Sequence, residues 1–117
     1  MTSAERRREL RARYDQRDRE AGVYGLRNTA TGRVLLATSI DLTAVRNKVE
    51  FARATGTPSA LDGRLAADIR EFGIDTFTFE VLDVLDVTPE MSVDDVRADL
   101  VALEQLWREK LAGVELY

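Results

Sequence analysis

Gly22-Val23-Tyr24 and Leu35-Leu36-Ala37 are the two stretches of this chain that decide its fold. Both consist mainly of apolar and aromatic residues, as strands do. Between them lies Thr29-Ala30-Thr31-Gly32, whose short polar residues and glycine are typical of a tight turn. We therefore predict a β-hairpin with strands over residues 22–28 and 33–38.

Capping residues predict four helices around this hairpin. They are expected over about residues 3–20 after a capping box at Thr2, over about 42–54 between Asp41 and Gly56, from a capping box at Ser59 to Gly73, and from Ser92 to Gly113. In the last helix, apolar residues recur at spacings of three and four, which predicts a stripe that packs on the sheet. This stripe consists of Val96, Leu100, Leu103, Leu106, Trp107 and Leu111.

One more strand is expected before the last helix. Residues 76–81 alternate between apolar and polar, which is typical of a strand with one buried face. The alternation breaks over residues 82–85, where we expect a bulge or the end of the strand, and residues 114–117 are expected to form a short tail. The predicted order is α-β-β-α-α-β-α, an α+β fold with a small, mostly antiparallel three-stranded sheet flanked by helices. We divide the chain into an N-terminal charged helix over residues 1–20 and a globular domain over residues 21–117.

The composition narrows the class of protein. The 117 residues suffice for one domain, and the absence of cysteine excludes a disulfide framework, a thiolate metal site and a cysteine nucleophile. No apolar run approaches the roughly 18 residues of a membrane span, and the charged N-terminus has no apolar segment of a secretory signal. We therefore expect a cytoplasmic protein without a membrane partner.

The charge is unevenly distributed along the chain. Residues 1–27 hold eight arginines against five acidic residues, whereas residues 28–117 hold nine basic residues against sixteen acidic ones. Binding to nucleic acid depends on neutralising phosphates, so the N-terminal segment is the candidate for contact with DNA. The residues predicted to make it are Arg6, Arg7, Arg11, Arg13 and Arg17. The alternative is a solvated helix whose charges are matched by i, i+4 pairs, such as Glu9 with Arg13.

The hairpin resembles the core hairpin of the GIY-YIG nuclease family. The resemblance extends over about residues 22–111 and includes Asn28, Gly32-Arg33, Asp41-Leu42, Phe72-Gly73 before Phe77-Thr78-Phe79-Glu80, and Leu103-Glu104-Gln105-Leu106-Trp107. In particular, the chain is similar to small bacterial stand-alone members that carry an N-terminal charged helix. The resemblance implies a GIY-YIG-like domain, and with it metal-dependent hydrolysis of DNA phosphodiesters.

The resemblance also implies roles for individual residues. In active members, two hairpin tyrosines and a helix histidine position and activate the water, a helix arginine binds phosphate, and a glutamate on the last helix holds a divalent metal ion. Tyr24 matches the first tyrosine and Glu104 matches the metal-binding glutamate, with Mg²⁺ or Mn²⁺ as the implied cofactor. The arginine aligns with Val45, so Arg46, one position on, is the catalytic candidate.

Other family positions are changed. Leu35 stands where the second tyrosine is expected, Ala37 where the glycine of that motif is expected, and Val49 where the histidine is expected; the chain contains no histidine. A late asparagine of the family has no counterpart, since Asn47 is the last asparagine. Because catalytic groups act as a unit, these losses predict a degraded site with weak or lost catalysis.

Three hypotheses about function remain open from the sequence. The first is a weakened metal-dependent endonuclease. The second is a non-catalytic module of the same fold that binds nucleic acid or a protein partner. The third is a small accessory domain that assembles through its N-terminal helix.

Overall fold

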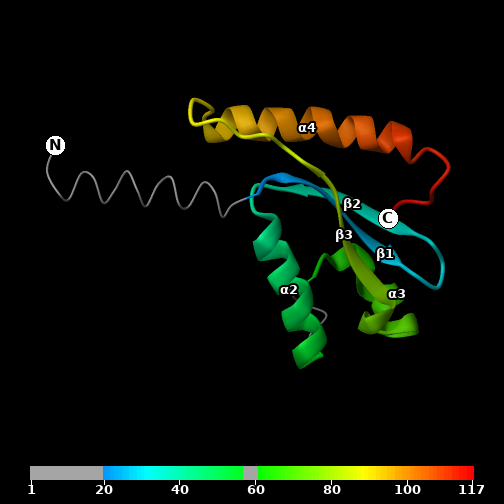
Figure 1. Cartoon of the computed structure of the whole chain (residues 1–117). Helices are drawn as coiled ribbons and strands as arrows, with labels where there is room; N and C mark the ends of the chain where they lie inside the picture. The colour runs from blue at the N-terminus through cyan, green and yellow to red at the C-terminus, as the bar shows by residue number, and fades with distance from the viewer. Residues whose placement is uncertain (1–19, 57–60) are drawn as a thin grey trace, which may run out of the picture.

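The computed structural model describes residues 20–56 and 61–117, and within them it confirms the predicted α+β fold (Figure 1). The strands are β1 (Gly22–Asn28), β2 (Val34–Ser39) and β3 (Phe77–Val84). The helices are α2 (Leu42–Thr55), α3 (Ala66–Phe72) and α4 (Val93–Lys110), and two short 3₁₀ turns, Gly63–Leu65 and Ile74–Thr76, flank α3. The predicted helix over residues 3–20, with its arginines, and the capping residue Ser59 lie outside the described residues.

The three strands form one antiparallel sheet with the order β2-β1-β3. The turn between β1 and β2 is held by the side chain of Asn28, whose Oδ1 accepts hydrogen bonds from the backbone N–H groups of Ala30 and Thr31. Gly32 completes the turn with a φ of 80°, a value that only glycine adopts without strain. The predicted hairpin is therefore confirmed, with β2 beginning one residue later than expected.

The predicted break in the alternation of the third strand is a β-bulge. Val23 pairs with Asp83 and Tyr24 pairs with Val81, so Leu82 is the extra residue on β3. Next to this bulge, β1 and β3 approach closely at Gly22, where a Cβ atom would lie 2.1 Å from the carbonyl oxygen of Asp83. Only glycine fits at this position, which explains the first residue of the Gly-Val-Tyr stretch.

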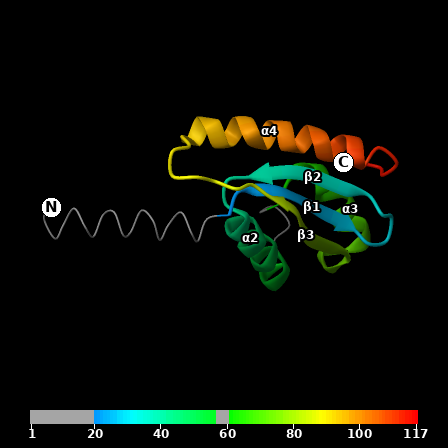
Figure 2. The same ribbon diagram turned by 45° about the horizontal axis from the view of Figure 1, so that its top comes forward.

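Helices cover both faces of the sheet. Figure 1 and the turned view in Figure 2 both show α4 on one face and α2 with α3 on the other. The buried core on the α2–α3 face consists of Leu26, Leu35, Val49, Leu65, Ile69 and Phe77. A smaller cluster beneath α4 consists of Ala21, Val96 and Leu100.

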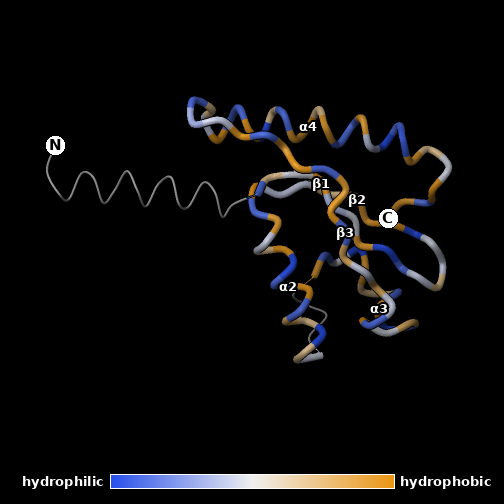
Figure 3. The backbone as a smooth tube through the Cα atoms, in the orientation of Figure 1, coloured by the Kyte–Doolittle hydropathy of each residue, from blue (hydrophilic) through white to orange (hydrophobic). Residues whose placement is uncertain are grey.

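The predicted stripe on α4 is only partly correct. Hydrophobic and hydrophilic residues alternate along this helix in Figure 3, and Val96 and Leu100 are buried. Leu106, however, is 53% exposed, contrary to the prediction. Residues turn by about 100° each around a helix, so position 106 lies about 80° away from position 96, whereas Trp107 returns to the buried side.

The caps predicted at Asp41, Gly56, Gly73 and Ser92 are confirmed. Asp41 caps α2, Gly56 ends it with a φ of 65°, and Ser92 forms a capping box with Asp95 at the start of α4. However, α4 ends at Lys110 and not at the predicted Gly113, and the helix expected from Ser59 begins only at Ala66, after the 3₁₀ turn Gly63–Leu65.

The C-terminal segment also differs from its prediction. Residues 114–117 are not a free tail: the backbone of Val34 accepts a hydrogen bond from Tyr117 and donates one to Glu115, so they extend the sheet beside β2. None of the helices within the described ranges is long and apolar enough to cross a membrane.

Candidate functional site

Tyr24 occupies the central strand and is half-buried. Its ring lies 5.6 Å from the ring of Phe79 and packs against the core on the α2–α3 face. Burial raises the pKa of the Tyr24 hydroxyl and the negative charge of Asp62 raises it further, while Arg64 lowers it. The hydroxyl is therefore protonated at neutral pH, a state in which it donates a hydrogen bond but does not act as a base.

Arg46 lies on α2 and reaches the same aromatic group. Its guanidinium carbon lies 5.5 Å from the centroid of the Phe79 ring. Phe79 therefore contacts both Tyr24 and Arg46, so the structure places these two predicted site residues around one ring. The arginine of the family aligns with Val45, one position before Arg46. Arg46 nevertheless lies beside the same ring as Tyr24.

Glu104 lies on α4, and its carboxylate is already paired. Arg108, one turn further along the helix, donates from Nη2 to Oε1 of Glu104 over 3.1 Å. Arg108 was not among the predicted site residues, although its i, i+4 spacing from Glu104 is a recognisable signal for such a pair.

A second ion pair follows α2 and was also missed. Asp62 accepts hydrogen bonds from Nε and Nη2 of Arg64 at 3.0 and 2.8 Å, and its Oδ1 also accepts one from the backbone N–H of Arg64. These bonds lower the pKa of Asp62 to about 2. The carboxylate is therefore ionised throughout the physiological range.

Arg64 also interacts electrostatically with two of the predicted site residues. The hydrogen bonds that Arg64 donates to Asp62 raise the pKa of the Arg64 guanidinium, and the charges of Tyr24 and Glu104 raise it further against an opposing effect of burial. Arg64 is thus close enough to β1 and α4 to interact electrostatically with both. No local sequence pattern indicates this proximity, because it depends on how the segment before α3 docks.

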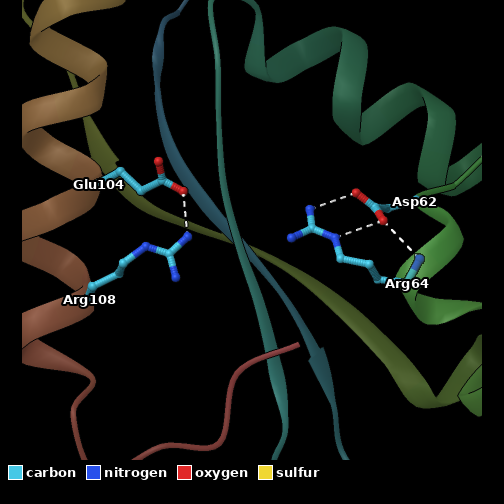
Figure 4. A network of polar contacts seen from close by, with 4 residues as sticks. All are labelled: Asp62, Arg64, Glu104 and Arg108. Carbon is cyan, nitrogen blue, oxygen red and sulfur yellow. Dashed lines mark hydrogen bonds and ion pairs between the residues drawn. The ribbon is translucent and has the colours of Figure 1, made fainter.

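Figure 4 shows the geometry of the two ion pairs. The side chains of Asp62 and Arg64 come from the segment before α3, those of Glu104 and Arg108 come from α4, and the two pairs point toward one another across β1 and β2. Arg64 therefore lies within electrostatic reach of the predicted residues Tyr24 and Glu104, and Arg108 pairs with Glu104; neither arginine was predicted. The arginines predicted to contact nucleic acid at residues 6–17 lie outside the described residues.

Two of the positions where the resemblance implies catalytic groups hold apolar residues of the core. Leu35 is 1% exposed and Val49 is 2% exposed, and both belong to the main hydrophobic cluster. Ala37 pairs directly with Tyr24 across β1 and β2. Apolar packing thus replaces a hydroxyl and an imidazole where the resemblance implies them.

The surroundings of Glu104 suit an anion better than a metal cation. Across residues 20–56 and 61–117, no group of three or more acidic side chains is arranged to hold a metal ion. Magnesium can be held by one carboxylate together with substrate phosphates. Here, however, that carboxylate is paired with Arg108 and lies within the electrostatic influence of Arg64, so two cationic groups oppose a metal cation.

Comparisons with known proteins identify the fold. No protein-family model matches the chain, and no curated protein sequence matches it. The structure is similar to the catalytic domain of the intron endonuclease I-TevI, solved as a glutamate-to-alanine mutant, with 15% sequence identity and a TM-score of 0.56. The similarity covers 80% of this chain and 84% of that domain. I-TevI is a GIY-YIG nuclease, and this chain has a GIY-YIG-like fold.

Proposed function

We propose that this chain is a nucleic-acid-binding protein built on a nuclease-like fold that has lost phosphodiester hydrolysis. The fold of I-TevI, an intron endonuclease, supports nucleic acid as the ligand. The main observation in favour of lost catalysis is that Leu35 and Val49 are buried in the core. We expect the protein to act in the cytoplasm.

The chemistry of phosphodiester hydrolysis explains why these two positions matter. The attacking water must lose a proton, and the charge that develops on the phosphate must be neutralised. Leucine and valine neither accept a proton nor donate a hydrogen bond. Tyr24 remains, but its raised pKa keeps its hydroxyl protonated, so it does not supply the base for the water.

The alternative is a weak metal-dependent endonuclease that uses Tyr24, Arg46 and Glu104 with Mg²⁺ or Mn²⁺. Nicking of supercoiled plasmid separates the two functions. Wild type, Glu104→Ala and the exposed control Glu109→Ala are purified identically and compared in Mg²⁺, in Mn²⁺ and in EDTA. We expect the same background nicking in every sample, whereas metal-dependent nicking by wild type and Glu109→Ala that Glu104→Ala lacks would establish the endonuclease.

Binding is tested separately from cleavage. Fluorescence anisotropy with labelled single-stranded and duplex DNA should show binding that weakens steeply as the salt concentration rises, because released counterions drive it. Absence of binding to both DNAs at low salt would reject nucleic acid as the ligand, and a protein partner would then be the remaining candidate.

A further inference from the structure

Two arginines face each other at the site, and both retain hydrogen-bonding capacity. A guanidinium has five N–H donors. Asp62 uses donors at Nε and Nη2 of Arg64, and Glu104 uses a donor at Nη2 of Arg108. The remaining N–H groups of both side chains have no partner among residues 20–56 and 61–117.

Both guanidinium groups are also accessible to a ligand. The side chains of Arg64 and Arg108 are 53% and 42% exposed, while their partners Asp62 and Glu104 are 35% and 24% exposed. Ion pairs this exposed to solvent contribute little to stability, so a competing anion can replace a carboxylate at small cost. A phosphate offers the same bidentate arrangement of oxygens to a guanidinium that a carboxylate does.

The two pairs come from segments that lie far apart in the sequence but point toward one another (Figure 4). The charge of Glu104 acts on Arg64 as well as on its own partner Arg108. A backbone phosphate placed between them would therefore meet a guanidinium from each side of the sheet. Such a two-sided arrangement recognises phosphate charge and does not read base sequence.

We propose that Arg64 and Arg108 form a two-arginine site for a nucleic-acid backbone phosphate, in which Asp62 and Glu104 occupy the guanidinium groups until phosphate replaces them. Glu104 then serves as the partner of Arg108 and not as a metal ligand, so binding needs no divalent ion. This inference rests on the proposed function and assigns it to particular residues.

The test is anisotropy binding of the full chain to labelled single-stranded and duplex DNA, in EDTA and in Mg²⁺. Arg64→Gln and Arg108→Gln should each weaken binding about tenfold and lower the slope of log affinity against log salt by about one. Asp62→Asn and Glu104→Gln remove the competing charge, so each should tighten binding about threefold. Mg²⁺ should not strengthen binding by any of these proteins.

A third ion pair provides the matched control. Arg27 donates to both carboxylate oxygens of Glu80 between β1 and β3, and its side chain is 44% exposed. Arg27→Gln carries the same change of charge, so the proposed site predicts a smaller effect for it than for Arg64→Gln. Far-UV circular dichroism and thermal unfolding of each variant show that the fold is retained.

The outcomes distinguish failure of the two-arginine site from failure of the proposed function. DNA binding by wild type that Arg64→Gln and Arg108→Gln weaken no more than Arg27→Gln overturns the two-arginine site and leaves the proposed function standing. If Glu104→Gln binds DNA more weakly than wild type in Mg²⁺ but not in EDTA, the two-arginine site is also overturned, because Glu104 then acts as a metal ligand. No binding by wild type to either DNA overturns the proposed function together with the site.

Discussion

Trp107 donates the N–H of its indole ring to Oδ2 of Asp83 over 3.0 Å, and this bond joins α4 to β3. Trp107 lies one turn from Glu104 on the same helix and one residue before Arg108. The bond therefore fixes the rotation of α4 that turns Glu104 and Arg108 toward the sheet. The ammonium group of Lys110 lies over the indole ring, 4.7 Å from its centroid.

Trp107→Phe should destabilise the protein by about 1–2 kcal/mol, because Asp83 loses its partner and the ring shrinks. Urea unfolding followed by far-UV circular dichroism measures the change, since Trp107 is the single tryptophan and fluorescence is lost with it. Asp83→Asn keeps an acceptor oxygen and should cost less. Equal stability of Trp107→Phe and wild type would mean that the bond does not anchor α4.

Gly22 and Gly25 should differ sharply in their response to alanine. A Cβ at Gly22 would lie 2.1 Å from the carbonyl oxygen of Asp83, so β1 and β3 must separate, at a cost of about 3 kcal/mol or more. At Gly25 the nearest atom is Cγ1 of Val34 at 3.1 Å, a side-chain atom, so the cost should be about 1 kcal/mol. Thermal unfolding compares the two variants, and equal losses would contradict this close approach of the strands.

Asn28 is a fully buried polar residue at the end of β1 and should be essential for stability. It accepts hydrogen bonds from the turn and donates to the Tyr117 hydroxyl at 3.2 Å, while that hydroxyl donates to Asp68. Asn28→Ala should cost about 2–3 kcal/mol, since buried partners lose their bonds.

Tyr117→Phe isolates the contribution of the C-terminal contact and should cost about 1 kcal/mol. Chemical unfolding of both single variants and of the double variant gives the coupling between them. Strictly additive losses would show that Asn28 and Tyr117 do not act as one network.

Restoring the missing catalytic residues should fail. Leu35→Tyr overpacks the core by about 1–3 kcal/mol, and Val49→His buries an imidazole at a comparable cost. We expect the double variant to unfold at lower temperature than wild type and to nick plasmid no faster. Metal-dependent nicking by a stably folded double variant would show instead that the site has kept the rest of its catalytic geometry.

The ion pair of Asp62 predicts a dependence of stability on pH. Because the folded-state pKa of Asp62 is lowered to about 2, its contribution is fully present above the ordinary pKa of 3.8 and is lost as the pH falls toward 2. Because the pair is exposed to solvent, the difference in unfolding free energy between wild type and Asp62→Asn should be small. It should be constant from pH 5 to 7 and should shrink below pH 4. A difference that persists unchanged at pH 2 would contradict the ion pair.

Local patterns predicted most of the fold correctly. The hairpin, the caps at Asp41 and Ser92, and the bulge after residue 81 depend on residues within a few positions of one another, and local sequence records such features. The exposure of Leu106 was missed because a spacing of three or four defines a stripe only when its members stay on one side of the helix. The docking of residues 114–117 beside β2 was missed because its partners lie more than 80 positions away.

The order of the elements, the absence of histidine and the replacement of the second hairpin tyrosine by Leu35 follow from residue identity and local spacing alone. By contrast, the burial of Leu35 and Val49 in the core and the position of Arg64 within electrostatic reach of Tyr24 and Glu104 depend on how the elements pack together. Arg64 and Glu104 are forty residues apart in the chain, the first in the 3₁₀ turn before α3 and the second on α4. Their meeting depends on the packing of the helices on both faces of the sheet, which local sequence patterns do not encode.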